Sequence, residues 1–131
     1  MQTIMIDGNS FDDLDAFYDE VQRKICPDFE GFGRNLDAFN DVLRGGFGLF
    51  EYGEPIKLVW TNSEKSKKDL GYEANLEWLK KIRITAHPSN HDSIDERIEK
   101  AKNKQGPTLF DQLLEIITGS EHADRIELVL E

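Results

Sequence analysis

The sequence has very little cysteine and no long apolar run, and each scarcity excludes a class of protein. Cys26 is the only cysteine among 131 residues, so no internal disulfide can form, which fits a reducing compartment. No stretch approaches the roughly 18 apolar residues that a membrane helix needs. Residues 1–7 lack the basic region and apolar core of a secretion signal. We therefore expect a cytoplasmic protein that does not enter a membrane.

Positive charge is also scarce. The chain has 16 Lys and Arg residues against 26 Asp and Glu residues, a formal net charge of −10. This excess repels phosphate backbones and anionic lipid surfaces, so neither a nucleic acid nor a membrane is an expected partner. The negative charge belongs to residues 1–60, with 12 acidic and 5 basic side chains, and to residues 106–131, with 6 and 1. The charge favours a basic partner.

The order of the apolar patterns predicts a single α/β domain over residues 1–131. Strand, helices, strand, helices, strand is the pattern of a small three-stranded parallel sheet packed against helices, because the long connections allow crossovers. Strands are predicted at residues 3–7, 56–60 and 125–130, the first of them buried. Helices are predicted from a Ser10 cap to 25, at 35–44, from 62 or 63 to 71, at 73–86, around 94–101 and from a Thr108 cap to about 117.

The first helix carries one apolar stripe, and its acidic side chains, Glu20 among them, fall away from that stripe. Cys26 follows this helix and is interpreted as a small apolar residue near its end. Trp60, which ends a strand, and Trp78 are interpreted as core aromatics. His122 is isolated in the sequence.

The helix at 35–44 carries an unusual acidic pair. Leu36, Phe39 and Leu43 lie within about 60° of one another and form its buried face. Asp37 and Asp41 are spaced i,i+4, lie roughly opposite that face, and repel each other by roughly 0.2–0.5 kcal/mol. Stability therefore gives little reason to place two carboxylates side by side there.

The surroundings of this pair favour a binding surface over an ordinary solvated face. Ala38, Arg34 and Arg44 are expected to share the outer face with the pair, and the small Ala38 leaves the surface flat. Glycine-rich loops precede and follow the helix, which would let another protein approach closely.

The segment from Gly33 to Leu43 resembles the signature helix of the barstar family, intracellular inhibitors of secreted bacterial ribonucleases. The family pattern Gly-x-Asn-Leu-Asp-Ala-Leu/Phe-x-Asp-x-Leu is matched throughout. The resemblance extends to the first strand and helix, to residues 58–60 and to residues 126–130, and thus covers about the first 65 and the last 25 residues. Residues 71–106 are longer than in small family members and are expected to add one or two helices.

This resemblance implies a barstar-like fold and an inhibitor, not an enzyme. The signature helix and its preceding loop would plug the active site of a barnase-like ribonuclease. Asp37 and Asp41 would be the anchoring carboxylates, with Asp41 deepest, where substrate phosphate would stand. The other predicted contact residues are Asn35, Ala38, Phe32, Gly33 and Arg44, with Phe47 at the position of a loop tryptophan and Glu115 on the last helix.

The expected partner is a basic ribonuclease, either secreted or part of a polymorphic toxin, from which the inhibitor protects the producing cell as an immunity protein. We expect the free inhibitor to be a monomer with no cofactor and no metal. Two alternatives stay open. One is a metal-dependent phosphodiesterase that uses Asp37 and Asp41 as Mg²⁺ ligands, although no third ligand has a motif-level reason to join them. The other is a barstar-like regulatory domain with a partner that is not a ribonuclease.

Histidine spacing gives the metal hypothesis no further support. His87 and His91 are spaced i,i+4, which on one helix would suggest zinc, but Pro88 interrupts such a helix.

Overall fold

A three-stranded parallel sheet forms one side of the protein. The computed structural model describes residues 1–131 and pairs β1 (Gln2–Asp7) with β2 (Ile56–Thr61), and β2 with β3 (Ile126–Leu130). The strand order is β1-β2-β3, and Leu58 on the central strand aligns with Ile4 on one side and Leu128 on the other. The predicted α/β architecture with a three-stranded parallel sheet is confirmed.

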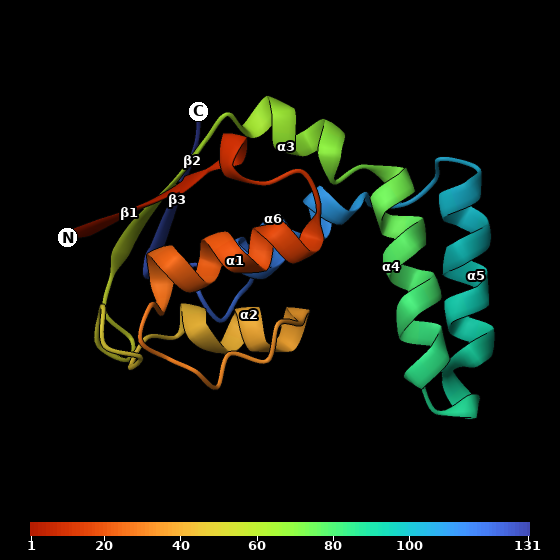
Figure 1. Ribbon diagram of the computed structural model, residues 1–131, viewed down its shortest axis with the longest axis horizontal. Coiled ribbons are helices and arrows are strands. Elements are labelled where there is room, and N and C mark those ends of the chain that lie inside the picture. Colours follow the sequence, from red (N-terminus) through yellow and green to blue (C-terminus); the bar gives the residue numbers. More distant parts are fainter.

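Six α-helices accompany the sheet: α1 (Leu14–Ile25), α2 (Leu36–Leu43), α3 (Ser63–Asp69), α4 (Tyr72–Thr85), α5 (His91–Lys102) and α6 (Leu109–Thr118). Two short 3-10 turns, η1 (Gly8–Ser10) and η2 (Pro88–Asn90), precede α1 and α5. Helices α1, α2 and α6 lie on the same side of the sheet, whereas α4 and α5 form a hairpin that projects from this body (Figure 1). None of these helices combines the length and apolar character that a membrane span requires.

The prediction that β1 is a buried strand is wrong. Its side chains alternate, with Ile4 and Ile6 in the core and Met5 43% exposed. The reason is position, because β1 is an edge strand and only the face toward the helices is covered. The central strand β2 is the buried one, and Trp60 on it is fully buried, as predicted.

Helix α1 begins later than the sequence pattern indicates. Its N-cap is Asp13, whose carboxylate accepts a hydrogen bond of 2.8 Å from the Ala16 N–H. The predicted cap, Ser10, instead ends the turn η1, which Asp7 caps by accepting a 2.9 Å hydrogen bond from the Asn9 N–H. The chain therefore first forms the turn that Asp7 caps, and α1 begins only after the cap at Asp13, six residues later.

Glu20 is buried, contrary to the prediction that it faces away from the apolar stripe. Its carboxylate is 1% exposed and accepts a 2.8 Å hydrogen bond from the Asp7 N–H at the end of β1. Arg23 and Lys24 compensate its charge at 2.9 and 3.5 Å. The physical reason is that α1 crosses the end of the edge strand, where a backbone donor needs an acceptor.

An aromatic cluster fixes the position of α2. Phe17 of α1 lies 5.3 Å from Phe39 of α2 and stacks on Trp60 of β2 at 5.4 Å, while Phe110 of α6 meets Trp60 at 5.2 Å. Cys26 joins this core at the end of α1, as predicted, and burial raises the pKa of its thiol to about 11. Helices α1 and α6, which contact α2 directly, and β2 beneath them therefore hold its inner face.

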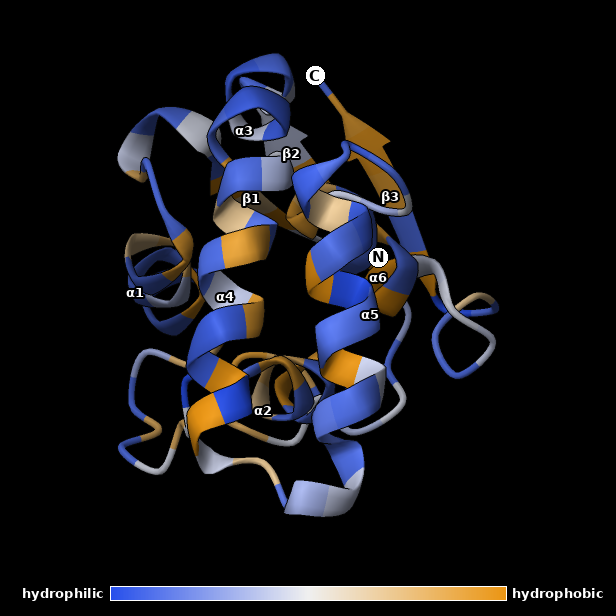
Figure 2. Ribbon diagram, turned by 90° about the vertical axis from the view of Figure 1, so that its right-hand side faces the viewer, coloured by the Kyte–Doolittle hydropathy of each residue, from blue (hydrophilic) through white to orange (hydrophobic).

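The hairpin of α4 and α5 has a small core of its own. Leu79, Ile94 and Ala101 form this second cluster, separate from the main one. Trp78 is half-buried and packs against both clusters, with the Arg97 guanidinium 5.4 Å from its ring. Figure 2 shows the two helices side by side, with hydrophilic residues along most of α5 and a mixture of hydrophilic and hydrophobic residues along α4. Residues 71–106 thus hold two helices, where one or two extra helices were expected.

Candidate functional site

The site is built on α2, which begins and ends within one residue of the predicted bounds. Asn35 is its N-cap, and its side-chain oxygen accepts a 2.7 Å hydrogen bond from the Ala38 N–H. Phe39, Val42 and Leu43 are buried on the inner side. Because these buried side chains hold α2 against the core, they also fix the direction in which the side chains on its outer face point.

Asp37 and Asp41 are both exposed on that outer face, with the half-buried Ala38 beside them. The Asp37 carboxylate lies in the first turn of α2, where the helix dipole favours a negative charge, and no side chain of the protein pairs with it. Asp41, by contrast, accepts a hydrogen bond from Arg44 within the same chain. The two carboxylates thus share a face and differ in their partners.

Arg34 does not lie on the outer face of α2, contrary to the prediction. Its backbone is left-handed, with φ of 53°, and its side chain turns back onto α1. The guanidinium donates 2.8 Å hydrogen bonds to the Asp19 carboxylate and the Asp15 carbonyl. Because Arg34 precedes the N-cap, it never enters the helix, and it instead fastens the loop before α2 to α1.

The loop before α2 places its predicted contact residues at different depths. Gly33 and Asn35 are exposed, whereas Phe32 is only 7% exposed and packs edge-on against Tyr18, with ring centroids 5.9 Å apart. Gln22 supports the same loop from α1 by donating a 2.8 Å hydrogen bond to the Phe29 carbonyl. Phe32 therefore anchors the loop to α1 in the free protein. Its role as a direct contact with a partner protein stays a prediction.

The loop after α2 is folded onto the loop before it. Gly45 and Gly46 both have φ near +90°, and Gly46 N–H donates a 2.8 Å hydrogen bond to the Phe50 carbonyl. The half-buried Phe47 lies in this loop, and its ring centroid is 4.6 Å from that of Phe29. A contact between two aromatic rings thus joins the loops on both sides of the helix.

A charged network at the end of α2 ties the helix to residue 121. The guanidinium of Arg44 binds both Asp41 and Glu121, and Asn40 donates a 2.9 Å hydrogen bond to the other oxygen of Glu121. Two hydrogen bonds lower the pKa of Glu121 to about 2, and the one from Arg44 has a larger effect than the one from Asn40. The same contact with Glu121 raises the pKa of Arg44.

His122 extends this network into the core. It is fully buried, with Nε2 2.7 Å from Asn40 Oδ1 and Nδ1 3.0 Å from a guanidinium nitrogen of Arg125. Because arginine only donates, Nδ1 must accept and Nε2 must carry the hydrogen, so the ring is neutral. Burial and the positive charge of Arg125 both lower the pKa of His122. Arg125 also donates to the Leu43 carbonyl at the end of α2.

Sequence reasoning missed Glu121 and His122, which lie about eighty residues from α2 along the chain. No local pattern marks them, because their partners come from tertiary packing. Glu115, the glutamate chosen on the last helix, is exposed on α6 and is not part of this network. The glutamate that reaches α2 is Glu121, in the turn before β3.

The structure brings no group of three or more His, Cys, Asp or Glu side chains into an arrangement that could hold a metal ion. His87 caps η2 by accepting a 3.1 Å hydrogen bond from the Ser89 N–H, and His91 begins α5. The site instead offers two exposed carboxylates on a helix whose inner face is packed against the core. Such an arrangement is suited to accept hydrogen bonds from the cationic side chains of another protein.

Two comparisons with known proteins bear on this site. The family model described as "Barstar (barnase inhibitor)" matches residues 1–88, which include α1, α2 and the loops around α2. The chain is also 38% identical, over 76 residues, to a protein of Bacillus subtilis (strain 168) named "Putative ribonuclease inhibitor YrdF". That match covers 57% of this chain and 76% of the relative.

Proposed function

Because this chain belongs to the barstar family of barnase inhibitors, we propose that it binds and blocks the basic active site of a bacterial ribonuclease. The target would be a secreted or polymorphic-toxin ribonuclease, barnase-like or related. The inhibitor would act as a cytoplasmic antitoxin, or immunity protein, that protects the producing cell. It would work by stoichiometric binding and not by catalysis.

The observation that carries this proposal is the fixed pair of carboxylates on α2. A ribonuclease cleft gathers positive charge to hold the phosphates of RNA, and carboxylates can accept bidentate hydrogen bonds there. The aromatic cluster beneath Phe39 and the cap at Asn35 hold the helix in place before binding. Little conformational entropy is then lost on association, which favours tight binding.

Charge supports the same proposal at long range. The protein carries a formal net charge of −10, and α2 presents two of its carboxylates side by side. Attraction between this surface and a basic enzyme speeds their encounter and makes the association rate fall with added salt. Asn35, Ala38 and Gly33 would complete the contact around Asp37 and Asp41, with Phe47 and Arg44 at the far end of the helix.

The test measures inhibition of RNA hydrolysis. The purified chain is titrated against barnase and against a panel of secreted bacterial ribonuclease domains with net positive charge, using a fluorogenic RNA substrate. We expect one-to-one inhibition of at least one enzyme. The variant Asp37→Ala/Asp41→Ala should lose it, whereas Glu96→Ala/Glu99→Ala, which removes two exposed carboxylates from α5, should inhibit like the wild type.

Two results would contradict the proposal. One is that no enzyme of the panel is inhibited, and the other is that the aspartate variant inhibits as well as the wild type. A control without ribonuclease measures hydrolysis of RNA and phosphodiesters by the chain itself with Mg²⁺ added. Turnover that disappears in the aspartate variant would establish the phosphodiesterase alternative instead.

A further inference from the structure

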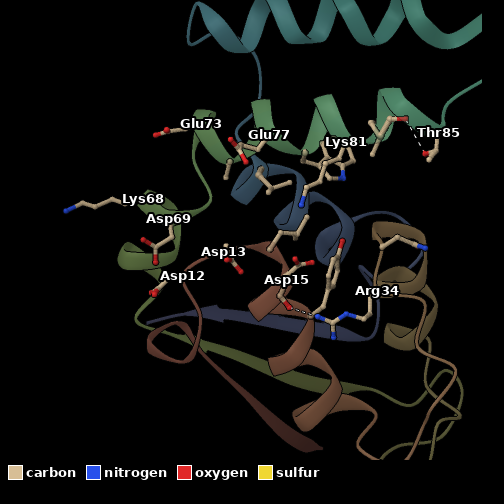
Figure 3. A pocket seen from close by; sticks show the side chains of 17 residues that line it. Asp12, Asp13, Asp15, Arg34, Lys68, Asp69, Glu73, Glu77, Lys81 and Thr85 are labelled. Carbon is tan, nitrogen blue, oxygen red and sulfur yellow. Dashed lines mark hydrogen bonds between the residues drawn. The ribbon is translucent and has the colours of Figure 1, made fainter. Parts of the chain in front are cut away.

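A groove of about 710 Å³ lies between α4 and the start of α1 (Figure 3). One wall is a single face of α4, on which Glu73, Glu77 and Trp78 recur turn after turn. The other wall comes from the beginning of α1, with Asp13 and Asp15. Helix α4 of the hairpin thus builds one side of this groove.

The groove ends at the proposed inhibitory face. Asn35, which caps α2, also lines the groove, as does Arg34 beside it. Figure 1 shows the far half of α4 at the level of α2 and apart from it. A protein seated on the N-terminal end of α2 would therefore stand at the mouth of the groove.

The charged side chains that line the groove and have no partner of opposite charge carry a net negative charge. Among its carboxylates, Asp12 and Asp69 are both paired with Lys65, and among its cations Arg34 is paired with Asp19. Four carboxylates have no cation partner in the chain, those of Asp13, Asp15, Glu73 and Glu77, against two unpaired lysines, Lys68 and Lys81. The remaining negative charge favours a positively charged occupant.

The aromatic lining of the groove suits a long basic side chain. The half-buried Trp78 contributes aromatic surface beside the acidic side chains, whereas Tyr18 also lines the groove but is only 3% exposed. Lysine and arginine bury their aliphatic stems on such surface while the charged group reaches a carboxylate or lies over a ring. Arg97 already lies 5.4 Å from the ring of Trp78, and Arg34 lies 5.9 Å from that of Tyr18.

We propose that this groove receives a lysine- or arginine-bearing loop of the same ribonuclease that α2 blocks. The hairpin is then a second contact arm, and it selects among ribonucleases by a loop outside their active site. This inference rests on the proposed function, because it takes the occupant to be the enzyme bound at α2. The main test reverses the charge of one wall in the variant Glu73→Lys/Glu77→Lys.

The probe is the ribonuclease of the panel that the wild-type chain binds most tightly, and the dissociation constant is measured by calorimetry. We expect the wall variant to weaken binding at least about tenfold, because like charges would then face each other in the groove. The matched control, Glu96→Lys/Glu99→Lys, makes the same change of charge on α5, outside the groove, and should change the constant by less than about threefold. Thermal unfolding of both variants verifies that they are folded.

A second readout reports on the groove directly. The chain has two tryptophans, of which Trp60 is fully buried and Trp78 lines the groove. Labelling only the inhibitor with 5-fluorotryptophan gives one fluorine resonance for each, assigned with Trp78→Phe. On adding the unlabelled ribonuclease, the Trp78 resonance should shift more than that of Trp60.

The outcomes separate the two proposals. If Asp37→Ala/Asp41→Ala abolishes binding while the wall variant binds normally and the Trp78 resonance does not move, the groove is not a contact and the proposed function stands. If no ribonuclease binds, or if the aspartate variant binds normally, the proposed function is wrong and the inference falls with it. A Trp78 resonance that shifts with the concentration of the chain alone would assign the groove to a second copy and also overturn the inference.

Discussion

Arg44 donates a hydrogen bond to the carboxylate of Asp41, so one of the two outward aspartates of α2 is already paired with a cation of its own chain. The same guanidinium binds Glu121 on its other side. A basic enzyme that approaches α2 as proposed would therefore meet a positive charge among the carboxylates. The ion pair with Arg44 would thus offset part of the proposed attraction between Asp41 and the enzyme.

Replacing Arg44 with glutamine should speed association with the ribonuclease by about threefold at low salt, because a repelling charge is removed from the face. Stopped-flow fluorescence measures the rate. Arg83→Gln is the control, since Arg83 pairs with Asp95 on the hairpin in a similar exposed ion pair. Slower association of Arg44→Gln would instead show that Arg44 itself attracts the enzyme.

Acid should loosen the end of α2 through His122. Its folded-state pKa is lowered from the ordinary value of 6.5, so the unfolded chain takes up the proton first as the pH falls. The stabilisation is complete above that value and is lost as the pH falls below it toward the folded-state pKa. Urea unfolding between about pH 7.5 and about pH 5.5 should show the free energy of unfolding decreasing in this window.

The variant His122→Gln tests the assignment. It should be less stable at neutral pH and should lose most of the dependence on pH in that window, because the titrating group is gone. His87→Gln, at an exposed histidine that caps η2, should keep the dependence of the wild type. A slope that survives in His122→Gln would mean that another group is responsible. Glu121 is distinguishable, since its pKa of about 2 moves its contribution to more acidic solutions.

Removing the carboxylate of Glu20 should destabilise the whole fold. In Glu20→Ala the Asp7 N–H at the end of β1 loses its acceptor while still covered by α1. An unsatisfied buried donor costs about 1–3 kcal/mol, which chemical unfolding can measure. Glu30→Ala, at an exposed loop position, should stay within about 0.5 kcal/mol of the wild type. Equal effects of the two substitutions would contradict the buried role of Glu20.

The turn after α2 should tolerate no side chain at Gly45. A Cβ there would overlap the Glu51 carbonyl, and φ is +89°. At Gly48 φ is also positive, but a Cβ would meet no atom within 4 Å. Both alanine variants carry the backbone strain, so Gly45→Ala should lose more stability than Gly48→Ala by at least about 1 kcal/mol, measured by thermal unfolding. Similar losses in the two variants would show that the loop moves aside.

The parts of the fold that rest on local sequence were predictable. Helix α2 was placed within one residue because its cap and its apolar spacing lie inside the segment itself. The Thr108 cap of α6 was placed for the same reason, and the structure shows that Thr108 and Asp111 form both hydrogen bonds of a capping box. The sheet followed from the order of the elements.

The parts that depend on tertiary packing were not predictable. Met5 looks as apolar as its neighbours, and only the position of β1 at the edge of the sheet leaves it exposed. Glu20 has the spacing of a surface residue but serves a backbone donor from another element. The contact of Asn40 with His122 spans 82 residues, and a single sequence carries no signal for such a pairing. The sequence therefore predicted Asp37 and Asp41, but it did not predict the hydrogen bonds that link α2 to Glu121 and His122.

The separate core of the hairpin offers a way to retarget the protein. Leu79, Ile94 and Ala101 pack among themselves, and hydrogen bonds from Tyr72 to the Gly106 carbonyl and from Asn75 to the Pro107 carbonyl close the base of the hairpin. A library that varies only the outer positions of α4 would leave the aromatic cluster and α2 untouched. Screening such a library against ribonucleases that the wild-type chain does not bind would test whether the hairpin alone can change the target of the proposed inhibitor, with α2 kept constant.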